Sequence, residues 1–363
     1  MSLTKKLHDL GQSLWLDNIT RGILDNGTLA RYIAEYSVTG LTSNPTIFDE
    51  AIAGSSFYDD GIRKKAKAGA KGEALFVDLA LEDLKRAADL FRPVFDRTEG
   101  VDGWVSMEVS PLLADDTRAT IEAARSIHKL ADRRNLYVKI PGTPAGVPAI
   151  EEAIFAGVPV NVTLLFSREQ YLAVAEAYMR GLERRIAAKL DVRTSSSVAS
   201  LFVSRWDKAV ADKVPAELRN RLGIAIAART YKAHCDLLKT ERWRALAAAG
   251  ARVQRMLWAS TGTKDPKASP TLYVEALVAP NTVDTMPEKT LAALAANKAN
   301  TAAATLTADG GDAEQVIARF AKAGVDVDAL AKKLQLEGAE SFVKSWKELM
   351  QSIADKSATL ATT

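Results

Sequence analysis

The chain contains 363 residues, of which 47% are apolar and 26% are charged, and its formal net charge at neutral pH is +3. This composition is typical of a globular protein with enough apolar residues for a large core, and the small net charge excludes a general polyanion binder. The single cysteine, Cys235, excludes an intrachain disulfide framework and a cysteine zinc site.

Eight short apolar segments are predicted to form β-strands. They lie at residues 13–18, 38–44, 103–110, 135–142, 158–166, 196–205, 255–261 and 274–281. Longer helical patterns separate them, and several have start signals. Asp115 or Asp116 is expected to cap the helix after the third strand, and Ser167 with Gln170 has the spacing of a capping box. Pro287 suits the first turn of a later helix.

The alternation of strands and helices predicts the fold class. Strands joined by helical crossovers pair in parallel, and eight such units favour a closed barrel over an open sheet. We therefore expect an α/β protein with a (β/α)₈ TIM barrel, a single domain over residues 1–363 with the barrel at about 13–290. The Ala-rich segment from Leu291 to Gly311 is expected to contain an exposed loop. Helices at about 312–355 are expected to pack outside the barrel or over its mouth.

The sequence lacks the common cofactor and metal motifs. No Gly-x-Gly-x-x-Gly or Gly-x-x-x-x-Gly-Lys-Ser/Thr loop follows a strand, and the three histidines (His8, His128 and His234) are far apart. Cys235 adjoins His234, but neighbouring residues on a helix point about 100° apart, which favours a structural role over a nucleophile. We therefore expect neither a cofactor nor a metal.

The sequence also restricts location and partners. The N-terminus lacks an apolar signal core and no apolar run reaches transmembrane length, so we expect a cytoplasmic protein with no membrane partner. The basic run at residues 63–72 favours a solvated helix end over a phosphate or nucleic-acid patch. No nucleic-acid partner is expected, and the sequence does not indicate an oligomeric state.

Polar residues gather at the predicted carboxyl ends of the strands, where a barrel of this type carries its chemistry. Lys139 is the most unusual of them, because burial of an unpaired charge in a strand interior is costly. Each of the others also has a structural explanation, as a turn residue, an ion-pair partner or a packed polar residue. Their convergence on one end of one barrel favours a site. The candidates are Asp17, Asn44, Glu108, Lys139, Asn161, Thr163, Ser200, Arg205, Ser260 and Lys264.

A lysine, a glutamate and an aspartate without metal ligands indicate a reaction class. The apolar residues around Lys139 are expected to disfavour its ammonium form and to yield a nucleophilic amine. Such an amine adds to a ketone or aldehyde and loses water, and the resulting iminium lets the adjacent C–C bond break or form. Asp17 and Glu108 suit the two proton transfers that these steps require.

Seven motifs resemble those of one enzyme family. The stretches "LWLDNI", "GLTSNPTIF", "VSMEVSPLLADDT", "YVKIPGT", "VNVTLLFS", "SVASLFVSRWD" and "WASTGTKDP" resemble transaldolases, and specifically their longer bacterial branch. The motifs run in family order over nearly the whole barrel. The resemblance implies a class I aldolase-type barrel that moves a dihydroxyacetone unit between sugar phosphates in the non-oxidative pentose phosphate pathway. Sedoheptulose 7-phosphate and glyceraldehyde 3-phosphate would give erythrose 4-phosphate and fructose 6-phosphate.

The resemblance also implies a role for nine of these candidates, all except Ser260. Lys139 would form the Schiff base and Asp17 would act on the donor C4 hydroxyl. Glu108 would act through a water held by Thr163. The substrate would be held by Asn44, Asn161 and Ser200 at its hydroxyls and by Arg205 at its phosphate, with Lys264 in place of an arginine found in shorter relatives.

Two alternative functions are open at this point. A related aldolase would use the same lysine to cleave fructose 6-phosphate without an acceptor, and the presence of both Glu108 and Thr163 favours transfer instead. A non-enzymatic sugar-phosphate-binding protein or scaffold is disfavoured, because a binding protein gains nothing from an isolated buried amine at Lys139.

Overall fold

Eight parallel strands form the centre of the molecule. The computed structural model describes residues 2–297 and 303–361. The strand order is β2-β1-β8-β7-β6-β5-β4-β3, and the barrel closes between β2 and β3, where the Leu41 amide donates to the Trp104 carbonyl at 2.9 Å. The strands are β1 (Gln12–Asp17), β2 (Val38–Thr42), β3 (Val105–Glu108), β4 (Leu136–Pro141), β5 (Val160–Leu165), β6 (Ser197–Phe202), β7 (Arg255–Ala259) and β8 (Thr282–Met286).

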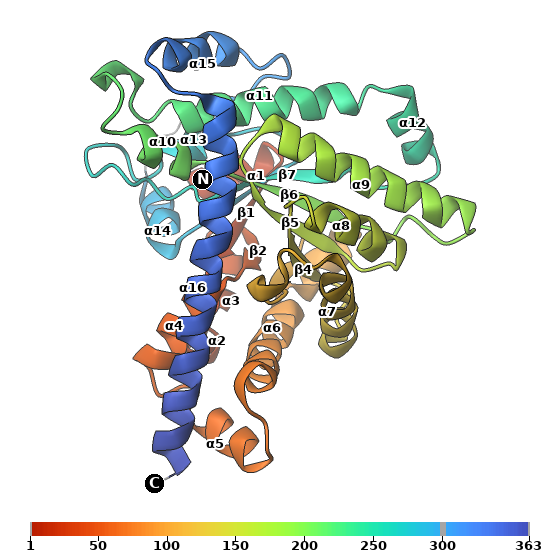
Figure 1. Cartoon of the computed structure of the whole chain (residues 1–363), viewed down its shortest axis with the longest axis vertical. Helices are drawn as coiled ribbons and strands as arrows, with labels where there is room; N and C mark the ends of the chain where they lie inside the picture. The colour runs from red at the N-terminus through yellow and green to blue at the C-terminus, as the bar shows by residue number, and fades with distance from the viewer. Residues whose placement is uncertain (1, 298–302, 362–363) are drawn as a thin grey trace.

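Helices surround the barrel and extend beyond it (Figure 1). Those that precede the fifth strand are α1 (Leu3–Asp9), α2 (Arg21–Asp25), α3 (Thr28–Glu35), α4 (Pro45–Gly54), α5 (Asp59–Lys67), α6 (Gly72–Arg97), η1 (Pro111–Leu113), α7 (Thr117–Ala131) and α8 (Gly146–Phe155). The later ones are α9 (Arg168–Ala187), α10 (Ser204–Val210), η2 (Ala216–Leu218), α11 (Leu222–Leu237), α12 (Glu241–Ala248), α13 (Leu272–Ala276), α14 (Glu288–Ala296), α15 (Ala313–Lys322) and α16 (Val327–Ala361). The predicted (β/α)₈ barrel is therefore confirmed.

Seven predicted strands are confirmed and the eighth is wrong. The segment 274–281 belongs to α13 and the turn that follows it, and β8 lies further on, at Thr282–Met286. An apolar run identified the wrong segment because β8 is rich in polar residues. Its Val283 packs in the barrel interior, and its Thr285 faces the mouth of the barrel, so the strand shows only weak apolar character.

The predicted helix starts are largely confirmed. The Asp116 carboxylate caps α7 by accepting from the Ala119 amide at 2.9 Å, and Ser167 with Gln170 forms the expected capping box on α9. Pro287 lies one position earlier than expected, as the N-cap of α14. The segment 291–311, expected to contain a loop, begins within α14, and residues 303–311 form no helix or strand. Residues 298–302 lie outside the described part of the chain.

Aromatic and ionic packing fills the amino end of the barrel interior. The rings of Trp104 and Tyr137 stack with centroids 3.9 Å apart. The buried guanidinium of Arg255 donates to the Ser13 hydroxyl at 2.7 Å, and the Asp102 carboxylate accepts from the Trp15 indole at 2.9 Å. Because these side chains close the amino end, the polar residues of the interior open to solvent at the carboxyl end.

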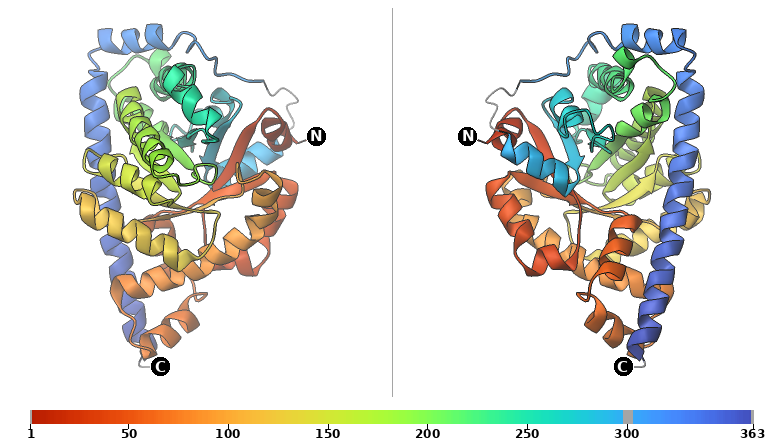
Figure 2. Two further views of the ribbon diagram at one scale, coloured as in Figure 1. Left: turned by 90° about the vertical axis from the view of Figure 1, so that its right-hand side faces the viewer. Right: turned by 90° about the vertical axis from the view of Figure 1, so that its left-hand side faces the viewer.

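The C-terminal helices are α15 and α16, at Ala313–Lys322 and Val327–Ala361. Helix α15 packs on α11, and α16 runs along one side of the barrel and continues past it to α5 (Figures 1 and 2). Trp346 of α16 is buried against Phe76 of α6, with ring centroids 5.2 Å apart. None of the described helices, long as α16 is, combines the length and apolarity needed to cross a membrane.

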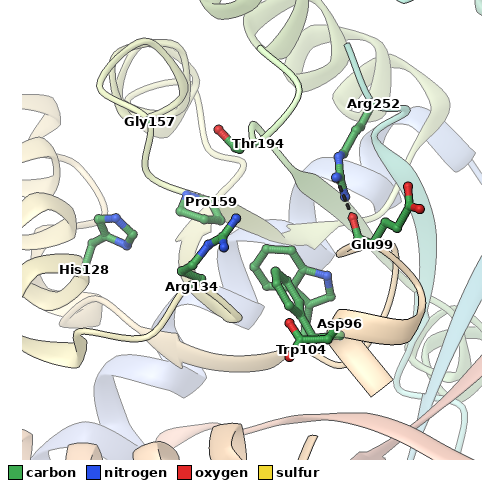
Figure 3. A pocket seen from close by; sticks show the side chains of 10 residues that line it. Asp96, Glu99, Trp104, His128, Arg134, Gly157, Pro159, Thr194 and Arg252 are labelled. Carbon is green, nitrogen blue, oxygen red and sulfur yellow. Dashed lines mark hydrogen bonds between the residues drawn. The ribbon is translucent and has the colours of Figure 1, made fainter. Parts of the chain in front are cut away.

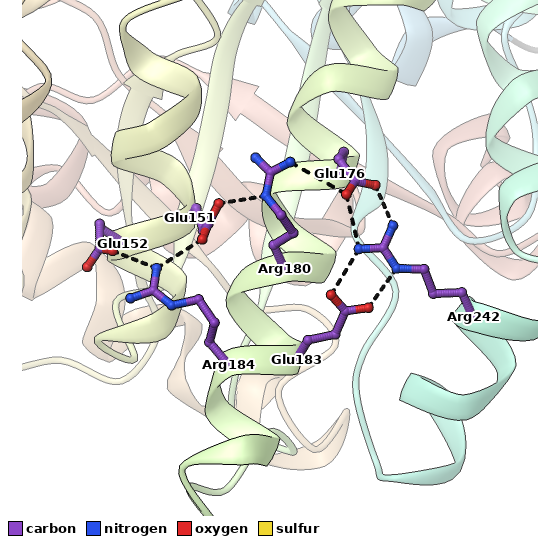
Figure 4. A network of polar contacts seen from close by, with 7 residues as sticks. All are labelled: Glu151, Glu152, Glu176, Arg180, Glu183, Arg184 and Arg242. Carbon is purple, nitrogen blue, oxygen red and sulfur yellow. Dashed lines mark hydrogen bonds and ion pairs between the residues drawn. The ribbon is translucent and has the colours of Figure 1, made fainter.

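Three outer helices are joined by an ion-pair network (Figure 4). Arg242 of α12 contacts Glu176 and Glu183 of α9, each at 2.6 Å, and Arg180 of α9 contacts Glu151 of α8 at 2.7 Å. All five side chains keep part of their surface in solvent, and exposed pairs of this kind each contribute little to stability. The network therefore mainly fixes how the outer helices lie against one another.

Two sequence features set aside as structural have ordinary surroundings. Burial lowers the pKa of His234 to about 4, and its ring nitrogen Nδ1 lies 2.8 Å from the Tyr171 hydroxyl. The adjacent Cys235 is half-buried. In the basic run at 63–72, Arg63 pairs with Asp60 at 2.6 Å and Lys65 pairs with Glu82 at 2.8 Å, as expected for a solvated helix end.

Candidate active site

A cavity opens at the carboxyl ends of the strands, and most of the sequence-predicted residues line it. Seven of the nine residues given a role above lie on its wall, and the other two, Glu108 and Asn161, lie behind it and bond to lining residues. The lining residues are Asp17, Thr42, Asn44, Lys139, Thr163, Ser200, Phe202, Arg205, Ala259, Ser260, Gly262, Lys264, Thr285, Pro287 and Phe342.

Lys139 projects into the barrel from β4 and has two polar partners. Its ammonium forms an ion pair with Glu108 of β3, the residue directly opposite it in the parallel register. It also donates to the Ser43 carbonyl at 2.8 Å. The expected apolar surroundings are only half right, because the alternation of a strand turns Val138 and Ile140 toward the outer helices. The charge is buried but paired.

Burial raises the pKa of the Glu108 carboxyl, and the nearby Asp17 charge raises it further, while Lys139 opposes both effects. Glu108 is 9% exposed and Lys139 is 6% exposed, so water screens their interaction weakly. A carboxylate with a raised pKa next to a buried ammonium is a suitable acceptor for its proton. The pair can therefore supply a neutral amine and a neutral acid at the same place.

Asp17 lies at the end of β1, on the wall of the same cavity. Burial raises its pKa, and the charge of Lys139, a hydrogen bond from the Thr42 hydroxyl at 2.8 Å and the more distant charge of Lys264 oppose this effect. The Thr42 hydroxyl also lies 2.7 Å from that of Thr285. Asp17 is thus a second carboxylate of raised pKa, held in a fixed position and facing the same cavity as Lys139.

Thr163 lies near the end of β5, opposite Pro141 in the β4 register. Its hydroxyl oxygen is buried and has no hydrogen-bond partner among the residues that the structure describes. A buried hydroxyl usually has a partner, so this one is suited to hold a polar group that enters the cavity. The next residue, Leu164, has a left-handed backbone conformation with φ +60°.

The amide and hydroxyl candidates differ in the hydrogen bonds that they already form within the protein. Asn161 lies opposite Lys139 in the register and is fully buried, bonded to the Ser106 hydroxyl at 3.2 Å and to the Ser200 hydroxyl at 2.7 Å. Asn44 caps α4, because its side chain accepts from the Ile47 amide at 3.1 Å. Asn44 and Ser200 line the cavity, and Asn161 contacts it through Ser200.

Two cations border the outer part of the cavity. Arg205 is not at the end of a strand as expected, but in the first turn of α10, because β6 stops at Phe202. Its guanidinium lies over the Phe202 ring, 5.1 Å from the centroid, and burial lowers its pKa. Lys264 is exposed in the loop after β7. Neither forms an ion pair within the described residues, so both charges are available to an anion in the cavity.

Comparisons with known proteins agree with this geometry. The family model described as "Transaldolase/Fructose-6-phosphate aldolase" matches residues 14–353. A relative from Thiobacillus denitrificans named "Transaldolase" is 44% identical over 97% of this chain and 100% of its own length. One from Saccharopolyspora erythraea with the same name is 43% identical over 96% of both chains, and "Transaldolase 2" of a Nostoc species is 38% identical over 97% of this chain and 96% of its own. The chain belongs to the transaldolase/fructose-6-phosphate aldolase family.

Sequence reasoning missed several residues of this family member's cavity. The Ser43 carbonyl accepts from Lys139, Thr42 and Thr285 adjoin Asp17, and Phe342 comes from the distant helix α16. Thr285 lies in β8, whose mostly polar sequence, TVDTM, hid the strand. The other contacts depend on neighbours across the barrel and have no signal in a single sequence. Within the described ranges, no group of three or more His, Cys, Asp or Glu side chains is arranged to hold a metal ion.

A second hollow lies at the opposite, amino end of the family barrel (Figure 3). Residues just before β3, β4 and β7 line it, namely Trp104, Arg134 and Arg252. Arg252 donates to the backbone carbonyl of Glu99 at 2.5 Å, and no lysine lines this hollow. In barrels of this type the amino end serves stability, so the chemistry belongs to the cavity at the carboxyl end.

Proposed function

We propose that the chain catalyses the transaldolase reaction, transferring a dihydroxyacetone unit from sedoheptulose 7-phosphate to glyceraldehyde 3-phosphate and giving erythrose 4-phosphate and fructose 6-phosphate. The relatives named transaldolase cover almost the whole chain. The observation that carries the proposal is one cavity in which a buried lysine paired with a carboxylate, Lys139 with Glu108, faces a second carboxylate, Asp17.

Lys139 begins the proposed reaction as a nucleophile. Proton transfer to Glu108 leaves a neutral amine that attacks the C2 carbonyl of the donor ketose. The carbonyl oxygen becomes the hydroxyl of a carbinolamine, and protonation from Glu108 lets it leave as water. The unpartnered hydroxyl of Thr163 is suited to hold a water in this exchange. The product is an iminium between Lys139 and the sugar.

Asp17 then takes the proton from the C4 hydroxyl. Its raised pKa makes it a stronger base than an exposed carboxylate. The C4–O bond becomes the carbonyl of the leaving aldose phosphate, and the electron pair of the C3–C4 bond moves to the iminium nitrogen and leaves an enamine on Lys139. The enamine carbon attacks the aldehyde of glyceraldehyde 3-phosphate, and Asp17 returns its proton to the new oxygen. Hydrolysis releases the product ketose.

The remaining residues hold the substrate in this proposal. Asn44 and Ser200 line the cavity at positions suited to sugar hydroxyls, with Asn161 fixing Ser200 from behind. Arg205 and Lys264 bring two positive charges to one end of the cavity, as a phosphate requires. The cytoplasmic location expected from the sequence stays a prediction.

Borohydride trapping tests the proposal. Incubation with fructose 6-phosphate and borohydride should add a reduced dihydroxyacetone unit to the peptide that contains Lys139, and a Lys139→Met variant should take up none. A control with borohydride alone should leave the peptide unmodified. Labelling of another lysine, or no labelling of active protein, would contradict the proposed mechanism.

The family description also includes fructose-6-phosphate aldolases, which would use the same lysine. An acceptor assay separates the two activities. Fructose 6-phosphate alone should release little free dihydroxyacetone, and added erythrose 4-phosphate should accelerate turnover by accepting the enamine. Release of dihydroxyacetone at the same rate with and without the acceptor would favour the aldolase.

A further inference from the structure

Helix α16 contributes one face to the mouth of the cavity. Gln335, Gly338 and Phe342 are three and four residues apart and so lie on one side of the helix. Phe342 lines the cavity. Gly338 lies so close to two site residues that a Cβ there would be 2.9 Å from a methyl carbon of Leu164 and 3.2 Å from a guanidinium nitrogen of Arg205. The helix thus approaches the site at several points, and Figure 2 shows it running beside the barrel.

Gln335 joins the ends of two strands. Its side-chain amide donates to the Gly142 carbonyl at 3.0 Å and to the Leu164 carbonyl at 2.9 Å. The Gly142 amide in turn donates to the Thr163 carbonyl at 2.8 Å. Gly142 directly follows β4, which carries Lys139, and Leu164 directly follows Thr163 in β5. One side chain of α16 therefore closes a ring of hydrogen bonds around the ends of both strands.

The backbone at Leu164 has an unfavourable conformation that contacts from another element must stabilise. Leu164 has φ +60°, a left-handed conformation that is unfavourable for a bulky side chain. The pairing of β5 with β6 also shifts register between Val162 and Leu165. Such conformations persist only where the surroundings hold them. Here α16 contacts both parts of the residue, the Leu164 carbonyl through Gln335 and the Leu164 side chain through Gly338.

We propose that Gln335 is a positioning residue for the transfer reaction, which fixes the ends of β4 and β5 and so sets the places of Lys139 and Thr163. This inference rests on the roles of those two residues in the proposed function. Gln335 itself does not line the cavity, and it acts through the backbone of Gly142 and Leu164. A shift of about 1 Å in a reacting group lowers rates on the order of a hundredfold. Loss of the two hydrogen bonds from Gln335, which we call the clamp, should therefore affect the chemical steps.

The test uses two variants of similar side-chain length. Gln335→Met removes the donor, and Gln335→Glu replaces it with a group that repels the two carbonyls. Both should lower kcat and the rate of borohydride trapping by about tenfold or more, with KM for fructose 6-phosphate changed by less than about threefold. Gln351→Met is the matched control, since Gln351 lies on the exposed part of the same helix and bonds only Asp355, at 2.8 Å. It should behave as the unmodified chain.

The trapping experiment separates misfolding from misplacement. The amplitude of trapping counts folded sites and its rate reports the placement of Lys139. A slow rate with full amplitude supports the clamp. A normal rate in Gln335→Met, with or without reduced amplitude, would overturn it. If the unmodified chain gave no adduct at Lys139, the proposed function would fail together with this inference. Normal trapping in both the unmodified chain and Gln335→Met would overturn only the positioning role of Gln335.

Discussion

Lys139 and Glu108 form a buried ion pair in the site. Breaking a buried pair by removing one member leaves the other charge uncompensated, which costs more than the pair contributes. Lys139 also donates to the Ser43 carbonyl at 2.8 Å, so its ammonium lies between two acceptors. In the proposed mechanism, the neutral amine arises by a proton shift toward Glu108 within this pair. This arrangement makes the roles of the two carboxylates separable by experiment.

Asp17 and Glu108 should serve different steps. Asp17→Asn keeps the acceptor for Thr42 but removes the base, so it should allow Schiff-base formation and slow C–C cleavage by about a hundredfold or more. Glu108→Gln should instead slow formation of the Schiff base by a similar factor, because the proton acceptor for Lys139 is lost. Single-turnover trapping with rapid quench measures both steps. The same blocked step in both variants would contradict the assigned roles.

Arg205 and Lys264 should recognise the phosphate to different extents. Arg205→Ala removes a charge-assisted contact that can be bidentate and should raise KM for fructose 6-phosphate by about a hundredfold. Lys264→Ala should raise it less, because the exposed ammonium is well hydrated. Neither change should alter turnover of unphosphorylated fructose, and Lys267→Ala, in the same exposed loop, is the control. Equal losses on fructose would assign both residues to structural support.

Asp284 should make stability fall as pH rises. Burial raises the pKa of this carboxyl from 3.8 to about 8, and the Thr261 hydroxyl donates to it at 2.8 Å. Between those two values the folded chain keeps a proton that the unfolded chain releases, so unfolding becomes easier with increasing pH. The free energy of unfolding of Asp284→Asn, measured relative to that of the unmodified chain, should therefore increase with pH. The increase from pH 5 to pH 8 should be roughly 1–3 kcal/mol. Urea unfolding at the two pH values, with exposed Asp212→Asn as control, measures the difference, and a pH-independent difference would rule it out.

The candidate site was predictable where polar residues interrupt apolar strands. Lys139, Asp17 and Glu108 stand out for this reason. In a barrel of this type, the carboxyl ends of the strands that carry them lie at the same face. The contact between Lys139 and the Ser43 carbonyl was not predictable, because the two residues are far apart in sequence. The alternation of side chains along β4 was also visible in the sequence. The polarity of the surroundings of Lys139 was not, because it depends on side chains from the neighbouring strands.

At the level of elements, β8 shows how polar content hides a strand. Thr282, Asp284 and Thr285 are all buried, and each makes hydrogen bonds to neighbouring elements that compensate its burial. A pattern search weighted toward apolar runs selects the end of α13 and the following turn instead, where Val274, Leu277 and Val278 are buried in the main core. The fold class survived this error because seven correct strands with helical connections already define a parallel barrel.

The first residue of α8, Gly146, should tolerate no added side chain. A Cβ on Gly146 would lie 1.9 Å from the Pro141 carbonyl oxygen, at the end of the strand that carries Lys139. Gly146→Ala should destabilise the fold by about 1–3 kcal/mol and lower kcat, because the end of β4 must move. Gly54→Ala is the control, since a Cβ there meets nothing within 4 Å at the end of α4. Thermal unfolding and steady-state kinetics measure both, and a Gly146→Ala variant as active and stable as Gly54→Ala would contradict the prediction.

For the whole molecule, we propose that the chain is one cooperative domain that includes α16. This helix packs on α4, α5, α6 and η1 and buries Trp346, so its separation would expose apolar surface on both sides. Hydrogen exchange in increasing urea should therefore show α16 and the barrel strands opening with the same free energy. Opening of α16 at clearly lower urea would indicate a separately folding segment.

The order of synthesis gives α16 a further consequence. Every residue proposed to touch the substrate precedes Gln335 in the sequence and leaves the ribosome before it. A chain that ends prematurely after α15 would carry a complete set of reactive groups but lack the side chain that joins β4 to β5. The final turns of α16 lie beside α5, where Lys356 pairs with Asp59 at 2.8 Å (Figure 1). The last turns of α16 are therefore distant from Gln335 along the helix, whereas a truncation that removed Gln335 would leave the ends of β4 and β5 without the side chain that joins them.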